Sequence, residues 1–395
     1  MAKLERFFRI FGPAWLVMLA DMDALSIIGA AQVGALFDYG LVWLMLLLII
    51  PLYVVQEVSG RIGAVTRKGL GTVIREHYSK KTAALMSVPM ALSDVMTYAA
   101  EYIGIAVGLD ILGIPIYLGI PLAYVVYLAI VYRKSYKYIQ GILVGVSGML
   151  MAGLLITLVL RGVKNYPIVY FSSAHAYLLL IAATIGAVIM PFMLFFQASA
   201  TAENMSERGS EPLKKVLREM KENTLLGAIV TEILMAVVEM TFSGIGGAAK
   251  LSTFASAQQL SKVMAPFAGA YAPYIFGIGL IGAGFLALNV VALGSAWGLA
   301  EALKIKRKKL IYVFESLPAA IAAMLMPSAF LINMVIAMLI VFVLVLIGPL
   351  IILGLLGRDK KIMHAYALTK REQLVYWLVS LAIVSLAVAA ALASL

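Results

Sequence analysis

Long apolar segments follow one another along almost the whole of this 395-residue chain. A helix crosses the core of a bilayer with about twenty apolar residues, and the sequence holds about eleven runs of that kind. These runs cover residues 11–37, 41–63, 82–109, 116–133, 139–161, 176–202, 224–246, 271–303, 310–328, 331–356 and 372–394. Apolar residues make up 63% of the chain and charged residues 13%, which is more apolar surface than a soluble domain of this size can bury. We therefore expect an all-α integral membrane protein.

The positions of the basic residues indicate how these spans are oriented. Lysine and arginine collect on the cytoplasmic side of membrane proteins. If the N-terminus is cytoplasmic, then of the 31 lysines and arginines only Arg161, Lys164, Lys250 and Lys262 fall on the outer side. The sequence thus predicts a multi-pass protein of the cell membrane with an extracytoplasmic C-terminus. The same asymmetry accounts for the net charge of +11, so we expect the lipid bilayer and no nucleic acid as a partner.

Composition limits the chemistry of the chain. It has no cysteine, which excludes disulfides and thiolate metal sites, and its three histidines are too scattered for an imidazole site. Any metal ion must therefore be bound by oxygen or by thioether sulfur, and no resident cofactor is expected. No segment between the spans is long enough to fold separately, so residues 1–395 are expected to form one membrane domain. The sequence leaves the oligomeric state open.

The first span contains two carboxylates. Asp21 and Asp23 lie between apolar stretches, with no lysine or arginine near them in the span. One charged residue at the centre of a membrane helix costs about 2.5–3.5 kcal/mol, so each needs a partner, water or a bound cation. A regular helix would turn the two side chains to different faces. We therefore expect an unwound turn at residues 21–26, where both carboxylates face one cavity.

A second interruption is expected in the sixth span. Pro191 has no N–H and its ring clashes with the preceding turn, which frees carbonyl groups near Gly186 and Ala187. Interrupted helices five spans apart are typical of secondary transporters with inverted repeats and a substrate site at the middle of the bilayer. The repeats would cover residues of about 11–161 and 176–356, followed by an extra helix at about 372–394.

The two interruptions together offer a mixed set of metal ligands. Asp23 has a carboxylate, Ser26 a hydroxyl and Met190 a thioether, while the unwound turns expose the carbonyls of Ala20 and Ala187. Mg²⁺ and Ca²⁺ prefer oxygen ligands alone, whereas thioether sulfur favours softer transition-metal ions. The ligand set therefore favours a divalent transition-metal ion as the substrate.

Several stretches resemble the Nramp family of divalent metal transporters. They are residues 12–17 leading to Asp23, residues 32–35, 56–66, 75–78, 101–104, 113–115, 189–191 and 359–363. This resemblance implies a LeuT-type fold with a 5+5 inverted repeat and broken helices 1 and 6. It also implies proton-coupled import of Mn²⁺, Fe²⁺ or similar ions. The metal site would lie at the positions of Asp23, Ser26 and Met190, with a main-chain carbonyl of the sixth helix.

The chain also departs from the family pattern. Residues 23–26 read Asp-Ala-Leu-Ser where the family has Asp-Pro-Gly-Asn, and Phe192 and Gln197 replace two histidines that are candidate proton carriers. On the third helix Glu101 matches the family, and Asp94 lies seven residues earlier on the same face. One interpretation is that Glu101, Asp94 and Tyr98 form a proton pathway. The other is that the carboxylates are held by hydrogen bonds between helices.

Alternative interpretations concern the substrate. Asp21 adds a second carboxylate, as a further metal ligand or as a proton carrier, and the harder ligand set that it creates would suit an Mg²⁺-like ion. A LeuT-type carrier of an organic substrate is a second alternative, but the two aspartates would repel an amino-acid carboxylate. We do not expect an enzyme, because both aspartates share one short segment instead of facing each other from two helices. Glu232, Glu239 and Asn289 are expected to be structural.

Overall fold

The computed structural model describes residues 13–132, 161–209, 211–244, 272–306, 308–325 and 328–393, together with short pieces between 145 and 159. The expected span at 139–161 lies mostly outside the described residues. The helices are α2 (Pro13–Asp21), α3 (Ala24–Phe37), α4 (Val42–Thr66), α5 (Leu70–His77), α6 (Lys80–Ile111), α7 (Ile116–Tyr132), α9 (His175–Val188), α10 (Pro191–Glu207), α11 (Leu213–Phe242), α13 (Ala272–Leu303), α14 (Lys308–Leu325), α15 (Ser328–Arg358), α16 (Lys360–Met363), the 3-10 turn η2 (His364–Tyr366) and α17 (Lys370–Ala393).

The helices match the predicted membrane spans closely. Within the described residues, seven helical segments are long and apolar enough to cross a membrane, with α9 and α10 taken together as one. The helices α3 and α7 are shorter and also apolar. Large apolar side chains are exposed on the outer helices, for example Leu122 of α7, Phe314 of α14 and Leu381 of α17. Such surfaces are suited to lipid and not to water.

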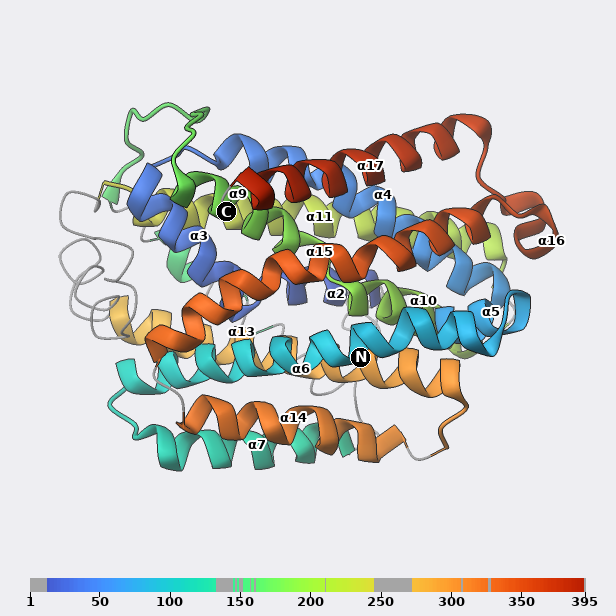
Figure 1. The fold of residues 1–395 in the computed structure, drawn as a ribbon, viewed down its shortest axis with the longest axis horizontal. Coiled ribbons are helices and arrows are strands. Elements are labelled where there is room, and N and C mark those ends of the chain that lie inside the picture. The colour runs from blue at the N-terminus through green and yellow to red at the C-terminus, as the bar shows by residue number, and fades with distance from the viewer. Residues whose placement is uncertain are drawn as a thin grey trace.

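Both predicted helix interruptions are present. The first span is divided at residues 22–23 between α2 and α3, and the sixth span at residues 189–190 between α9 and α10. In Figure 1 these four half-helices and α15 lie in the middle of the molecule, between α4 and α17 along one edge and α6, α7 and α14 along the other. The interrupted helices are therefore surrounded by continuous ones, which is where non-helical backbone is tolerated at membrane depth.

The continuous helix α6 supports the interrupted helices from one side. It packs along α13 and also contacts α14 and α3. Glycine permits close approach at this interface, because a Cβ on Gly108 would overlap the carbonyl oxygen of Gly277 in α13. On the other side, α11 contacts α2, α3 and α4. Each half of the first broken helix thus lies between α11 and the pair formed by α6 and α13.

A buried ionic network joins α4, α11 and α17 at one end of the helices. Arg61 of α4 is paired with Glu57 at 2.8 Å and with Glu372 of α17 at 2.7 Å. Lys221 of α11 lies 3.4 Å from Glu57 and 3.9 Å from Glu372. Because Arg61 and Glu57 have only 7% of their side-chain surface exposed, the network fixes the relative positions of these three helices.

Candidate metal-binding site

Two carboxyl groups meet at the N-terminus of α3. Asp23 is the N-cap of this helix, and its Oδ1 atom accepts a hydrogen bond from the N–H of Ser26 at 2.5 Å. Glu101 of α6 accepts a hydrogen bond from the N–H of Ala24 at 3.2 Å and also lies against the Asp23 carboxyl group. Gly104 makes this approach possible, because a Cβ at that position would overlap the Cβ of Ala24. The positive end of the α3 dipole therefore holds two carboxyl groups at membrane depth.

The capping of α3 explains why the first span is interrupted without proline or glycine. The first N–H groups of a helix have no partner within the helix. Here Asp23 and Glu101 satisfy two of them, and the backbone of Asp23 is extended. The family pattern places Pro-Gly at the residues that are Ala24 and Leu25 in this chain. The unwinding that the sequence predicts is thus confirmed, and side-chain caps from two helices maintain it.

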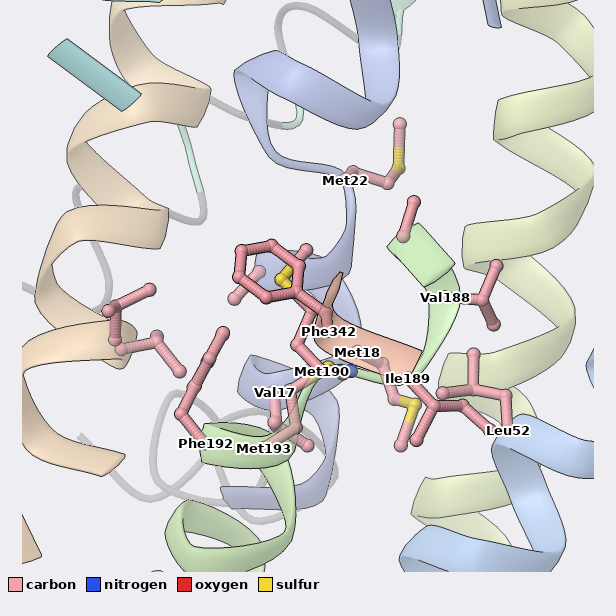
Figure 2. Close-up of a cluster of buried hydrophobic side chains, with 14 of the residues drawn as sticks. Val17, Met18, Met22, Leu52, Val188, Ile189, Met190, Phe192, Met193 and Phe342 are labelled. Atoms are coloured by element: carbon pink, nitrogen blue, oxygen red, sulfur yellow. The ribbon is translucent and has the colours of Figure 1, made fainter. Parts of the chain in front are cut away.

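Met190 occupies the corresponding place in the second interrupted span. It is the N-cap of α10 and is followed by Pro191, the residue type favoured at the first position of a helix. Figure 2 shows Met190 among buried apolar side chains that include Met18 of α2 and Phe342 of α15. Its N–H lies 3.4 Å from the Sδ atom of Met193. The predicted thioether is therefore buried at the break, as a transition-metal ligand would be.

Sulfur is more abundant at the two breaks than the sequence analysis recognised. Met18, Met22, Met190 and Met193 are all buried around the breaks, and Figure 2 shows the four of them together. The signal was present in the sequence, because Met22 lies between the two aspartates and Met18 lies one turn before it. Of these four, the ligand set predicted from the sequence includes only Met190. These thioethers give the region around the aspartates a soft, polarisable surface.

The other predicted ligands are close to the breaks. The Ser26 hydroxyl is buried and has no hydrogen-bond partner. Ala20 and Ala187 lie in the last turns of α2 and α9, where carbonyl groups lack helical partners. The half-helices are also in contact, α2 with α10 and α3 with α9. Within the described part of the chain, no three acidic or histidine side chains form a metal cluster, so an ion here needs mixed donors.

Asp21 and Asp23 have different surroundings. Asp21 is the last residue of α2 and is buried, and the carboxylate that acts on it most strongly is Glu232 of α11, ahead of Asp23. Glu232 is completely buried, and neither of its carboxylate oxygens has a hydrogen-bond partner. The sequence predicts a structural role for Glu232. A structural role of the usual kind would give it a hydrogen-bond donor.

The three candidate proton-pathway residues lie along one buried face of α6. Glu101 contacts α3, and the hydroxyl of Tyr98, one turn earlier, lies 3.5 Å from a carboxylate oxygen of Glu315. Glu315 of α14 also accepts a hydrogen bond from Ser295 at 3.0 Å, and its charge acts on Asp94. The sequence analysis did not identify Glu315. The signal was an acidic residue within an apolar span.

Two other buried polar residues have the structural contacts that the sequence predicts. Glu239 of α11 accepts a hydrogen bond from the N–H of Leu41 at 2.7 Å, at the start of α4. Asn289 of α13 donates to the carbonyl of Phe285 one turn earlier in its own helix. Asn289 and one carboxylate oxygen of Glu239 therefore have partners within the protein, while the other oxygen of Glu239, Oε2, has none.

Comparisons with known proteins agree with this architecture. The Nramp family profile, described as natural resistance-associated macrophage protein-like, matches residues 14–393. A divalent metal cation transporter MntH from Caldanaerobacter subterraneus is 24% identical over 291 residues, which cover 72% of this chain and 69% of the relative. The protein of the same name from Bacillus subtilis is 26% identical over 297 residues, covering 71% and 67%.

The fold is shared with a solved structure. The crystal structure of the Eremococcus coleocola manganese transporter in complex with an aromatic bis-isothiourea substituted compound aligns with a TM-score of 0.82 at 18% identity. The alignment covers 98% of this chain and 87% of the other, which confirms the predicted LeuT-type fold. Since the family profile spans almost all of the sequence, the chain belongs to the Nramp family of divalent metal transporters, and it is not an enzyme.

Proposed function

We propose that this protein imports a divalent transition-metal ion of the Mn²⁺ or Fe²⁺ type by alternating access. The observation that carries the proposal is the pairing of two interrupted helices, one with a carboxylate at its break and the other with a thioether. The ion would be bound by Asp23, Ser26 and Met190 with the carbonyls of Ala20 and Ala187. Asp21 would add negative charge on one side of this site.

The burial of the ligands supports transport by alternating access. Asp23 has no exposed surface and Met190 has 1%. An ion can reach such a site only when half-helices move, and the short half-helices α2 and α10 are the natural moving parts. The continuous helices α6 and α13 would remain in place. With the N-terminus in the cytoplasm, as the distribution of basic residues predicts, α2 would open the site toward the cytoplasm.

The donor set supports a transition metal over Mg²⁺. A magnesium ion binds oxygen at near-octahedral geometry and keeps several waters, and it has no use for sulfur. The thioethers of Met18, Met22, Met190 and Met193 are instead buried near the two helix breaks, where they offer soft donors. Relatives named as divalent metal cation transporters and the fold of a manganese transporter agree with this substrate class.

Proton coupling is the second part of the proposal. Glu101 lies against Asp23, so a proton on Glu101 responds directly to the charge of an ion at Asp23. From there, Tyr98, Glu315 and Asp94 continue along the contact between α6 and α14. This route does not require the positions of Phe192 and Gln197, where the family pattern has histidine.

Uptake into proteoliposomes tests both parts. Wild-type protein should import Mn²⁺ and Cd²⁺ in preference to Mg²⁺ and Ca²⁺, with acidification of the lumen reported by a pH dye. Asp23→Ala should abolish uptake. Met190→Ala should weaken Mn²⁺ and Cd²⁺ uptake, while Ca²⁺ or Mg²⁺ uptake stays the same or rises. Glu101→Gln should remove the pH signal. Asn289→Ala is the matched control, because that amide donates its hydrogen bond to the carbonyl of Phe285 in its own helix. Mg²⁺ uptake alone would reject the transition-metal assignment, and normal Mn²⁺ uptake by Asp23→Ala would reject the site.

A further inference from the structure

Glu232 is a buried carboxylate that the metal site proposed above does not use. It lies on α11 with no exposed surface, and no group donates a hydrogen bond to either of its oxygens. No ion pair among the described residues includes Glu232 or Asp21, whose Oδ1 atom also lacks a hydrogen-bond partner. Two adjacent buried carboxylates without basic partners are stable only if protons or a cation neutralise their charge.

Tight packing of α2 against α11 brings these two carboxylates together. A Cβ on Gly227 of α11 would overlap the side chain of Met18, so this glycine sets the helix separation. One turn later the hydroxyl of Thr231 donates a hydrogen bond to the carbonyl oxygen of Met18 at 2.8 Å. Glu232 follows Thr231, and Asp21 lies one turn after Met18. The packing of Met18 against Gly227 and the hydrogen bond from Thr231 therefore fix this juxtaposition.

The C-terminal end of α2 adds further negative potential at this place. The last four carbonyl groups of a helix have no helical partner, and the helix dipole carries about half a negative charge at that end. In α2 these carbonyls belong to residues 18–21. Carbonyl ends of half-helices coordinate the coupling cations of other carriers with interrupted helices. Carboxylate and carbonyl oxygens without sulfur are the ligands of hard cations.

Charge balance indicates the valence of the cation. Asp21, Asp23, Glu101 and Glu232 are buried around the break between α2 and α3. One divalent ion at Asp23 compensates two of their negative charges, and a proton on Glu101 compensates a third. The remaining negative charge is neutralised by one further proton or by one monovalent cation, and either belongs between Asp21 and Glu232.

We propose that Asp21 and Glu232 form a second cation site, between α2 and α11, which binds a hard monovalent cation of the Na⁺ class. The proposal rests on the function proposed above. A cation at this place ties the half-helix α2 to α11 and holds the inner side of the metal site closed. Its release would allow α2 to move, so Na⁺ would influence the turnover of metal transport.

Thermal unfolding of the purified full-length protein in detergent tests the site directly. NaCl is exchanged for KCl or choline chloride at constant ionic strength and pH, without divalent ions. Wild type should be stabilised by Na⁺ in a saturable manner and by choline not at all. Glu232→Gln should weaken the apparent affinity for Na⁺ by about tenfold or more. Glu239→Gln is the matched control, because Glu239 lies two turns further along α11 and contacts Leu41 instead of α2; it should respond to Na⁺ as wild type does.

The outcomes separate this inference from the proposed function. Mn²⁺ uptake into proteoliposomes is measured with and without Na⁺ on the same preparations. If wild type imports Mn²⁺ but neither uptake nor unfolding responds to Na⁺, or if K⁺ and choline act equally, the second site is rejected while metal transport stands. An unchanged Na⁺ response in Glu232→Gln also rejects it. If that variant does not fold, Glu232→Asp should fold and bind Na⁺ more weakly than wild type. Na⁺ stabilisation without any Mn²⁺ uptake would reject the metal substrate and leave the cation site supported.

Discussion

The contact between Gly104 and Ala24 makes a prediction that depends on the structure alone. In Gly104→Ala the new Cβ would lie within 3.0 Å of the Cβ of Ala24, a distance that real Cβ atoms essentially never show. The N-terminus of α3 must then move from α6 by at least about 1 Å, at a cost of about 1–3 kcal/mol for overpacking. The hydrogen bond from Ala24 to Glu101, now 3.2 Å, would lengthen to about 4.2 Å and be lost.

Loss of that bond removes a cap from the helix that positions Asp23. A hydrogen bond to a charged group contributes about 1.5–3 kcal/mol, so the variant should be destabilised by about 3 kcal/mol or more in total. The displaced N-terminus of α3 also moves Asp23 from its position in the proposed metal site, so Mn²⁺ uptake should fall by about tenfold, the equivalent of about 1.4 kcal/mol, even in molecules that remain folded. The assays are thermal unfolding in detergent and initial uptake rates in proteoliposomes, normalised to folded protein.

Gly29→Ala is the matched control for this experiment. Gly29 lies within α3, and a Cβ there meets nothing within 4 Å, so the change should preserve uptake. It should also stabilise the helix slightly, because alanine favours helix over glycine by about 1 kcal/mol. Wild-type stability and uptake in Gly104→Ala would refute the reasoning, since they would mean that α3 does not rest on α6 as described.

Three further changes test other parts of the structure. Arg61→Ala should lower the free energy of unfolding by about 3 kcal/mol, because Glu57 loses its buried partner and Lys221 replaces it only in part; denaturation in detergent measures this. Glu372→Gln should have a smaller effect of about 1 kcal/mol, since that carboxylate is 37% exposed; equal losses in the two variants would contradict the network. Glu315→Gln should leave Mn²⁺ binding near wild type and slow lumen acidification, and an unchanged proton signal would remove α14 from the pathway.

The sequence predicts the positions of the helices and their interruptions better than it predicts which side chains meet between helices. Apolar run length located the spans, and Pro191 with the two aspartates located both interruptions within a few residues. Partners across helices could not be predicted, because one sequence gives the spacing along a helix but not the rotation of the helix against others. Asp21 and Asp23 are expected to face one cavity, and only the structure adds that Glu232 on α11 lies near Asp21 and that Glu101 on α6 lies against Asp23.

The same limitation explains the residues that were missed. Glu232 and Glu315 are single acids in apolar spans, and nothing in their own segments distinguishes them from Glu239, one oxygen of which accepts a hydrogen bond from a backbone N–H. Glu232 has a second carboxylate as a neighbour because α11 contacts α2. Glu315 has one because α14 contacts α6. In contrast, Met22 could have been recognised from its position between the two aspartates.

Asp23 has two roles that Asp23→Ala cannot separate. It caps α3 through the N–H of Ser26, and it is the proposed carboxylate ligand of the metal. Asp23→Ala removes both, and loss of the cap alone costs about 1 kcal/mol. Asparagine caps helices about as well as aspartate but carries no charge. Asp23→Asn should therefore keep the thermal stability of wild type without metal, while Asp23→Ala is less stable.

Metal binding distinguishes the two roles. Stabilisation by Mn²⁺ should disappear in both variants if the carboxylate binds the ion, because a neutral amide cannot compensate a divalent charge in a buried site. If Asp23→Asn retained both its stability and its response to Mn²⁺, Asp23 would be only a cap. The ion would then have to be held by the thioethers and by Asp21, and the break in the first helix would serve to present Asp21. The comparison of the two variants therefore tests whether the residue that interrupts the helix is also the residue that binds the substrate.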